Sequence, residues 1–314
     1  MGIEIATRMS YGNALCELGA THENMAVLDA DLAGATMTKI FRDKYPERFF
    51  NCGIAEQNMM GVAAGLAAAG KLVFASSFAM FAAGRAYEII RNSIGNTGLN
   101  VKIAATHAGV AVGEDGASHQ CVEDVMLMRA IPGMTIINPA DDIEARAATL
   151  AMADFYGPTY LRLGRLPVPI INDFPEYKFR VGEGVVLRSS PEDSVTIIST
   201  GLVVERALGA HKILRDKGIF ARVINIHTIK PLDDELILRA AAETGRIVVA
   251  EEHLTCGGLG SAVCEAVLEK KPVPVKRIGI NDVFGYSGPA LELLKIFGLT
   301  AENIAAVAED FLKQ

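Results

Sequence analysis

Residues 53–75 read GIAEQNMMGVAAGLAAAGKLVFA, and this stretch indicates the fold. A helical run of Gly, Ala and Met, with Glu56 as its one charged side chain, is followed by a short apolar strand, Leu72 to Ala75. Abundant Gly and Ala with few aromatic residues suit closely packed layers of helix and sheet. The stretch therefore predicts one unit of an α/β sheet.

The same alternation continues along the first half of the chain. Predicted strands are residues 25–31, 72–75, 101–105, 135–137 and 159–163. Predicted helices are residues 7–18, 36–45, 53–69, 84–94, 122–130 and 139–154. Strands separated by helices of this length predict a mainly parallel sheet with helices on both faces.

A second α/β unit follows a break in the pattern. Residues 167–177 contain three prolines and little periodicity, which is typical of a linker. Beyond it, strands are predicted at residues 195–198, 222–225, 247–250 and 275–278, and helices at 203–217, 233–243, 259–269 and 301–312. We predict two three-layer α/β domains, at residues 1–170 and 191–314, joined by a linker at 171–190.

Composition limits the class of protein. The chain has 314 residues, 50% of them hydrophobic, and a net charge of −7 without any basic run, so no nucleic-acid partner is expected. It has no N-terminal signal pattern, and its longest apolar helical stretch is far below the roughly 20 residues that span a bilayer. Five scattered cysteines without a C-x-x-C pair are typical of reduced thiols. We expect a cytoplasmic protein with no membrane partner.

Glu56 is the leading candidate for a catalytic group. A carboxylate before a nearly uncharged helix is costly unless something binds it, and burial raises the pKa of a Glu. A perturbed carboxylate that faces a cleft is a candidate general acid or base. The alternative is a capping role, with Gly53 as N-cap and Glu56 three residues later. The two roles can coexist.

Other candidate residues follow the predicted strands at one edge of the first sheet. In open α/β sheets, ligands bind beyond the carboxyl ends of the strands. The residues at that edge are Asp31, Phe78, Phe81, His107, Asp115, His119 and Arg165. Each alone would be an ordinary core or surface residue, but their shared location predicts a binding site.

Several motifs together resemble transketolase, specifically its C-terminal half. They are residues 53–57, 76–78, 106–107 and 113–120, supported by 6–8, 30–32, 158–165 and 251–260. The resemblance covers essentially the whole chain. It implies a thiamine diphosphate-binding fold, with a pyrimidine-type domain followed by a transketolase C-terminal-like domain.

The resemblance implies a role for each candidate at the cofactor. Glu56 would be catalytic, hydrogen-bonding N1′ of the aminopyrimidine of thiamine diphosphate. Phe78 would stack on that ring, and Phe81, Asp31 and Ile54 would complete the cofactor-binding set. The cofactor would supply the electron sink, and the protein would supply orientation and proton placement.

The resemblance likewise implies a sugar-phosphate site. His107, Arg8 and Arg165 would hold the phosphate, a task that suits the forked guanidinium group of Arg. Thr36 is a further candidate for a phosphate contact. Asp115 would bond a substrate hydroxyl group, and His119 would lie near the reacting centre as a second catalytic residue.

The sequence departs from the transketolase pattern at two places. Gly84 stands where transketolases commonly carry a third aromatic residue near the pyrimidine. Ala108-Gly109 replaces the usual Asp-Ser and is closer to deoxyxylulose-phosphate synthase, which however has Arg at the position of His107. Substrate preference is therefore less securely predicted than the cofactor.

The motif that anchors the diphosphate and its Mg²⁺ in this family, Gly-Asp-Gly, does not occur in the sequence. We therefore predict no metal ligands in this chain, and a separate N-terminal subunit that supplies the diphosphate and metal site in a two-plus-two heterotetramer. Residues Gly61, Gly65 and Ala69 form a smooth helix face, suited either to an interface between two copies or to packing on its own sheet. Residues 257–260 could mimic a phosphate cradle, although tight helix packing is the favoured interpretation.

Other functions stay open. The chain could serve a related thiamine-dependent enzyme: a deoxyxylulose-phosphate synthase, a transketolase for branched sugars, or the β subunit of a 2-oxoacid dehydrogenase. It could also be a scaffold that kept the fold without activity. The combination of His107, Asp115 and His119 favours phosphorylated ketoses as substrates.

Overall fold

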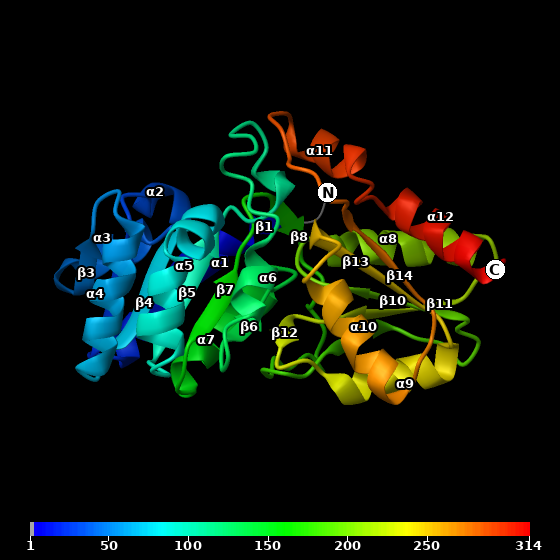
Figure 1. Ribbon diagram of the computed structural model, residues 1–314, viewed down its shortest axis with the longest axis horizontal. Coiled ribbons are helices and arrows are strands. Elements are labelled where there is room, and N and C mark those ends of the chain that lie inside the picture. The colour runs from blue at the N-terminus through cyan, green and yellow to red at the C-terminus, as the bar shows by residue number, and fades with distance from the viewer. Residues whose placement is uncertain (1–2) are drawn as a thin grey trace.

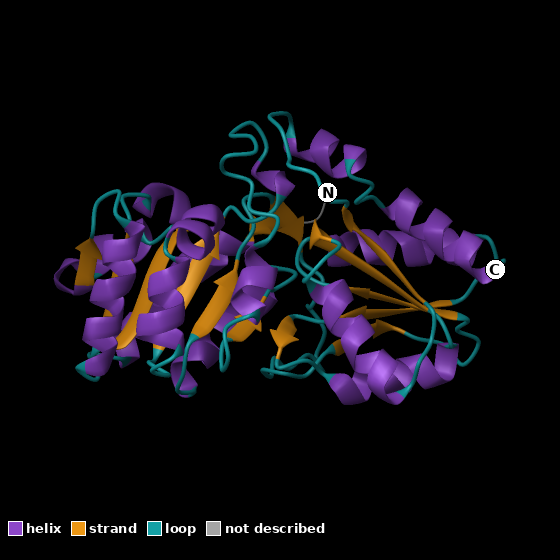
Figure 2. Ribbon diagram, in the orientation of Figure 1, coloured by secondary structure: helices purple, strands orange, loops and turns teal. Residues whose placement is uncertain are grey.

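The computed structural model describes residues 3–314, and it contains two large β-sheets lying side by side, each covered by helices (Figures 1 and 2). The first sheet has seven strands in the order β12-β6-β7-β5-β4-β2-β3. The second has five, in the order β14-β13-β10-β11-β9. Most neighbouring strands run parallel, which confirms the predicted α/β class.

The first sheet is built around strands buried on both faces. Its parallel strands are β2 (Met25–Asp29), β3 (Phe49–Asn51), β4 (Leu72–Phe78), β5 (Val101–Thr106), β6 (Thr135–Ile137) and β7 (Thr159–Arg162). The strands β2, β4, β5 and β7 are buried along their whole length, as continuous apolar runs in a covered sheet should be. All but β3 correspond to predicted strands.

Helices cover the first sheet, and some differ from the prediction. They are α1 (Thr7–Thr21), α2 (Ala33–Thr36), α3 (Lys39–Lys44), α4 (Glu56–Ala68), α5 (Tyr87–Ile89), α6 (Asp124–Arg129) and α7 (Asp142–Asp154). Short turns are η1 (Pro46–Arg48), η2 (Met80–Arg85), η3 (Ile90–Gly95) and η4 (Val110–Val112). The single helix predicted at 84–94 is instead α5 flanked by the wider π-helical turns η2 and η3, a geometry that often marks functional sites.

The second sheet follows the prediction closely. Its strands are β9 (Val185–Arg188), β10 (Val195–Ser199), β11 (Ala221–Asn225), β13 (Ile247–Leu254) and β14 (Val275–Ile280). Its helices are α8 (Val203–Asp216), α9 (Asp234–Thr244), α10 (Leu259–Lys270), α11 (Ala290–Ile296) and α12 (Ala301–Leu312). The strand β9 lies inside the predicted linker and pairs antiparallel with β11. The exact domain boundaries stay a prediction.

Two short pairings connect distant parts of the chain. The strand β12 (Thr228–Lys230) comes from the second half but pairs antiparallel with β6 at the edge of the first sheet. The strands β1 (Glu4–Ala6) and β8 (Pro167–Pro169) form a separate antiparallel pair. None of these three-residue strands shows a period in the sequence, so none was predicted.

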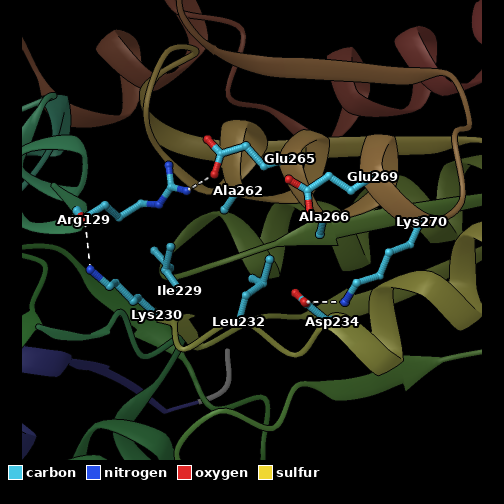
Figure 3. A pocket seen from close by; sticks show the side chains of 10 residues that line it. All are labelled: Arg129, Ile229, Lys230, Leu232, Asp234, Ala262, Glu265, Ala266, Glu269 and Lys270. Carbon is cyan, nitrogen blue, oxygen red and sulfur yellow. Dashed lines mark hydrogen bonds and ion pairs between the residues drawn. The ribbon is translucent and has the colours of Figure 1, made fainter. Parts of the chain in front are cut away.

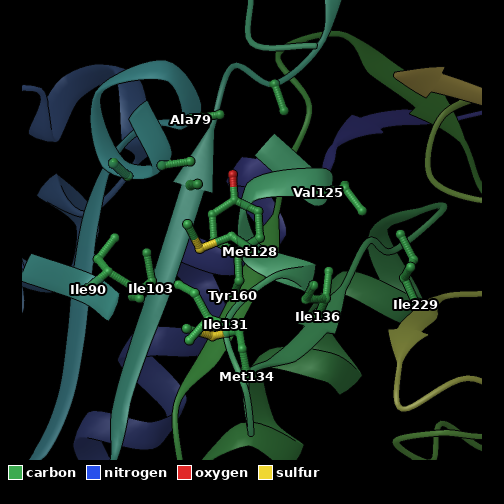
Figure 4. Close-up of a cluster of buried hydrophobic side chains, with 14 of the residues drawn as sticks. Ala79, Ile90, Ile103, Val125, Met128, Ile131, Met134, Ile136, Tyr160 and Ile229 are labelled. Atoms are coloured by element: carbon green, nitrogen blue, oxygen red, sulfur yellow. The ribbon is translucent and has the colours of Figure 1, made fainter. Parts of the chain in front are cut away.

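The hydrophobic core runs from one half into the other. Figure 4 shows part of it, with Ile103, Met128 and Tyr160 near one another, and with Ile229 of the second half beyond Ile136. Tyr160 is fully buried, and its hydroxyl donates to Asp124 Oδ2 at 2.8 Å. Each apolar side chain buried here contributes about 1.5–3 kcal/mol relative to exposure. The two halves are therefore joined by packing as well as by the chain.

A buried carboxylate also joins the halves. Glu144 on α7 accepts hydrogen bonds from the Asn225 side chain at 2.9 and 3.0 Å and from the Tyr177 hydroxyl at 2.9 Å. Its neighbour Asp141 caps α7 and accepts the N–H groups of Ile171 and Asn172, both at 2.7 Å. These bonds hold the segment between the sheets against the first half.

Across residues 3–314, none of the helices combines the length and the apolar character needed to span a membrane.

Candidate active site

Glu56 is the first residue of α4, at the carboxyl-end edge of the first sheet. Its side chain is only 1% exposed, and Arg85 of η2 donates to Glu56 Oε2 at 2.8 Å. The N-cap of α4 is Ala55, without a side-chain capping bond. The capping alternative is therefore wrong, because Gly53 is not the N-cap and Glu56 is the first residue of the helix rather than the third.

Four aromatic rings form one group beside this carboxylate, which we call the ring cluster: Phe78, Phe81, His107 and His119. The rings of Phe78 and Phe81 are stacked with centroids 5.9 Å apart, and Phe78 stacks on His107 at 3.9 Å. The His119 ring meets Phe81 edge-on at 5.2 Å. Arg85 lies over Phe81, 4.6 Å from its centroid, so it links the ring cluster to Glu56.

His107 adopts a backbone conformation that few residues tolerate. Its φ is +56°, and its Nδ1 lies 2.9 Å from the hydroxyl oxygen of Thr106. Such strain persists only where the surroundings enforce it, and it is common at functional sites. Burial lowers the pKa of His107 to about 3, with smaller contributions from Arg8, Arg165 and His119. The imidazole is therefore neutral at pH 7.

The two arginines predicted to bind phosphate lie close to one another. The pKa of Arg8 is lowered by burial and by the positive charge of Arg165. Arg8 donates to the carbonyl of Ala35 at 2.6 Å, and Arg165 donates to the carbonyl of Val112 and to Glu114 at 3.3 Å. Two guanidinium groups beside a neutral imidazole make a local anion site in a protein of negative net charge.

The remaining predicted residues lie outside the ring cluster and the arginine pair. Asp31 has φ +63° and accepts from the Asn51 side chain at 2.9 Å, while Ile54 is 79% exposed and Asp115 is exposed on the loop after β5. Thr36 is buried, and its hydroxyl donates to Asp29 Oδ2 at 2.7 Å. The hydroxyl of Thr36 thus points to an internal partner. The roles of all these side chains stay predictions.

A largely apolar hollow of about 500 Å³ opens beside Phe81 and Arg85. Its lining is Met80, Phe81, Gly84, Arg85, Ala117, Ser118, Gln120, Glu123 and Phe284. Gly84 thus lines the hollow at the position where a larger side chain is common in the family that the sequence resembles, and a Cβ there would lie 2.1 Å from Met80 Cε. Phe284, which is 83% exposed, comes from the second half and was missed by the sequence analysis, because no local pattern connects it with the first domain.

A second hollow, of about 350 Å³, lies between the halves and contains none of the predicted residues (Figure 3). Its opposite charges pair with each other: Arg129 with Glu265 at 2.7 Å and Lys270 with Asp234 at 3.2 Å. Lys230 donates to the carbonyls of Arg129 and Ile131. The cations here already have partners within the chain, and none of them is a predicted site residue.

The glycine-rich turn at residues 257–260 holds an internal carboxylate. Glu251 accepts the N–H groups of Leu259 and Gly260, each at 2.7 Å, at the start of α10. A Cβ on Gly258 would lie 2.2 Å from Glu251 Oε2, so the glycine permits close approach. The interpretation as tight packing is confirmed, since Glu251 fills the position that a phosphate would need.

The fold and site together define an α/β protein of two domains with a carboxylate, an aromatic stack and an anion site at one sheet edge. Residues 3–169 match the model of the transketolase pyrimidine-binding domain, and residues 182–304 that of the transketolase C-terminal domain. The chain belongs to the transketolase family, as its motifs predicted.

Proteins of similar length show which part of transketolase this chain resembles. A Methanocaldococcus jannaschii protein named as a transketolase C-terminal section is 49% identical over 319 residues, covering 100% of this chain and 98% of that protein. A 6-deoxy-6-sulfo-D-fructose transketolase subunit of Clostridium sp. is 42% identical, covering 96% and 93%. The solved structure of a split-gene transketolase, described as an inactive β4 tetramer, has a TM-score of 0.89 and 50% identity and covers 98% of both chains.

The residues of the site fit the pyrimidine end of thiamine diphosphate. A buried carboxylate can bond a ring nitrogen, the stacked Phe pair can bind an aromatic face, and the adjoining hollow has room for a ligand. Within residues 3–314, no group of three or more His, Cys, Asp or Glu side chains is arranged to hold a metal ion.

Proposed function

We propose that the chain is the C-terminal subunit of a thiamine diphosphate-dependent transketolase. It transfers a two-carbon ketol unit from a ketose phosphate to an aldose phosphate, and it is active only with an N-terminal partner subunit. The observation that carries the proposal is Glu56, a 1% exposed carboxylate next to the ring cluster. The bound cofactor supplies an electron sink for carbanion chemistry.

Each residue of the site has a task in this reaction. The carboxyl group of Glu56 would hold a proton for the pyrimidine nitrogen, and Phe78 and Phe81 would orient the ring. Arg8 and Arg165 bind the anionic end of the sugar, and Asp115 bonds its hydroxyl groups. His119 lies edge-on to Phe81 and can move a proton near the reacting carbon.

The partner subunit is part of the proposal. The sequence lacks Gly-Asp-Gly, so the diphosphate and its Mg²⁺ are held by the second chain. Support comes from the split-gene relative, whose β4 tetramer is described as inactive. We propose a cytoplasmic two-plus-two heterotetramer.

The face of α4 at Gly61 and Gly65 is exposed, and a Cβ at either position would meet no atom within 4 Å. Packing of this face on its own sheet is therefore wrong, and an interface role is favoured.

The test is transfer by the reconstituted pair of subunits. Glu56→Ala should lower ketol transfer from xylulose 5-phosphate by a factor on the order of 10² to 10⁴ while leaving assembly intact, because the proton-holding group is removed. Turnover like that of the wild-type pair would refute the proposal. So would decarboxylation of pyruvate without any ketol transfer.

A second candidate substrate class is favoured by one relative. The Clostridium subunit, 42% identical, is named for a sulfonated ketose. The pair Arg8 and Arg165 can bind a sulfonate as well as a phosphate, because both anions present oxygens to the guanidinium forks. A donor panel that compares 6-deoxy-6-sulfofructose, branched ketose phosphates and xylulose 5-phosphate distinguishes these substrates.

A further inference from the structure

The loop between β5 and α6 carries His107, Asp115 and His119 but has little regular structure of its own. Apart from the turn η4, it contains left-handed backbone at His107, at Gly109 (φ +79°) and at Gly113 (φ +84°). Glycine adopts such backbone without strain, whereas at His107 it persists only where other contacts determine it. The shape of this loop, which we call the substrate loop (residues 107–123), therefore depends on what packs against it.

A carboxylate from the second half lies directly under the substrate loop. Glu252 of β13 is 4% exposed, and its Oε1 accepts the N–H of Ala111 at 2.6 Å. A Cβ on Gly109 would lie 2.2 Å from Glu252 Cδ. Only glycine permits both the left-handed φ and this approach, so Gly109 and Glu252 are complementary.

Glu252 is itself held in place by the first half. Arg162 Nη2 donates to the carbonyl of Glu252 at 3.0 Å, and Arg162 Nε donates to Asp124 Oδ2 at 2.8 Å. The side chains of Arg162 and Asp124 are 5% and 0% exposed. A buried, bidentate ion pair of this kind is geometrically rigid, so it gives Glu252 a fixed position from which to hold the loop.

The second half holds the far side of the substrate loop as well. Gln120 Nε2 donates to the carbonyl of Tyr286 at 3.1 Å, and Ser287 Oγ donates to the carbonyl of Glu114 at 2.5 Å. Figure 1 shows the substrate loop rising beside the segment that leads into α11. A Cβ on Gly285 would lie 1.8 Å from Gln120 Oε1, so this contact is also close.

We propose that Glu252 is a positioning residue: through the N–H of Ala111, the second half sets the shape of the loop that carries His107, Asp115 and His119, and so sets donor binding. The statement about donor binding rests on the proposed function. The statement about loop shape does not. The C-terminal half thus has a task at the active site without contributing a group that reacts.

Hydrogen–deuterium exchange of the full-length chain tests the loop directly. In Glu252→Ala, amides of residues 108–120 should exchange about tenfold faster, because the bond to Ala111 is lost, while α10 keeps its protection. Glu252→Gln preserves the shape and one acceptor, so its effect should be smaller, and it covers the case in which the Ala variant does not fold.

Glu251→Gln is the matched control. Glu251 is the adjacent carboxylate, is equally buried and also accepts backbone N–H groups, but those belong to α10. This variant should loosen the start of α10 and leave the substrate loop protected. Unchanged loop protection in both Glu252 variants, or equal loosening of loop and α10 in them, would overturn the proposal.

The kinetic test uses the chain reconstituted with its partner. Glu252→Ala should raise the KM for xylulose 5-phosphate by about 10- to 100-fold, as small misplacement of binding groups does, and leave the dissociation constant of thiamine diphosphate unchanged. Equal losses for donor and cofactor would show a general structural defect and refute positioning. If wild-type subunits show no ketol transfer, the proposed function fails, whereas the exchange result still decides the loop.

Discussion

Arg85 donates to Glu56 Oε2 at 2.8 Å while its guanidinium group lies over Phe81. The carboxylate is 1% exposed and the Arg85 side chain is 47% exposed, so the pair joins a buried charge to a half-exposed one. Any ligand that bonds Glu56 must share this carboxylate with Arg85 or displace it. The pair is therefore a measurable feature of the chain before any partner or ligand binds.

Removing Arg85 should destabilise the isolated chain. Arg85→Met leaves a buried carboxylate without its partner, which costs about 1–3 kcal/mol of unfolding free energy. The double variant Glu56→Gln/Arg85→Met should recover most of that loss, because no buried charge remains. Urea unfolding of the wild type, both single variants and the double variant measures this coupling.

Arg91→Met is the control for that cycle. Arg91 is exposed on η3 and donates only to the adjacent Asn92, so its loss should change stability by less than about 0.5 kcal/mol. If Arg85→Met has no larger effect than Arg91→Met, the contact with Glu56 is not an energetic one.

Glu144 should make stability depend on pH. Burial raises the pKa of Glu144 to about 7, above its ordinary value of 4.5. The folded chain thus binds this proton more tightly than the unfolded chain does. The contribution of this proton to the free energy of unfolding is fully present below about pH 4.5. It is lost as the pH rises through 7, and the loss amounts to up to about 3 kcal/mol. Burial gives Glu252 the same direction, with its pKa raised to about 7.

Comparing wild type with Glu144→Gln isolates this group. From pH 5 to pH 8, the unfolding free energy of the wild type should fall relative to that of Glu144→Gln, because Gln does not titrate. Glu176→Gln, at an exposed position, should follow the wild type at both pH values. A constant difference between wild type and Glu144→Gln would contradict the assigned titration.

Arg165 should govern binding of the anionic donor. Arg165→Gln removes one of two adjacent guanidinium groups, and a charge-assisted hydrogen bond is worth about 1.5–3 kcal/mol. We expect the KM for xylulose 5-phosphate to rise about 10- to 100-fold in the reconstituted enzyme. Arg146→Gln alters an arginine that pairs with Glu17, and it should leave KM unchanged. An unaltered KM in Arg165→Gln would remove this residue from the site.

The exposed face of α4 should control self-association. A Cβ at Gly65 would meet no atom within 4 Å, and replacing a helical Gly by Glu adds about 0.5–1 kcal/mol of helix stability. The variant should therefore stay folded and lose association between copies, as measured by sedimentation. Leu268→Glu, at a 65% exposed apolar position on α10, should associate as the wild type does. Unimpaired association of Gly65→Glu would place the interface elsewhere.

The predictable parts of this fold are those encoded in consecutive residues. Apolar runs predicted β2, β4, β5, β6 and β7 and the main strands of the second sheet, because most residues of these strands are buried. The short strands β1, β8 and β12 escaped prediction, since their pairing depends on a neighbour that is remote in sequence. The π-helical turns η2 and η3 were also missed, because residues 84–94 were assigned to one regular α-helix.

For the site, the order of residues along the chain is enough to show that a lone carboxylate, Glu56, stands at the start of a helix of small residues, and that aromatic and cationic residues follow neighbouring strands. These features can be read from consecutive residues. The folded structure was needed to show that Arg85 is the partner of Glu56 and that Glu252 lies under Ala111, 141 residues away in sequence. The first pairing depends on how two helical segments pack on one sheet and the second on how two separate sheets pack, and no local pattern of residues specifies either arrangement.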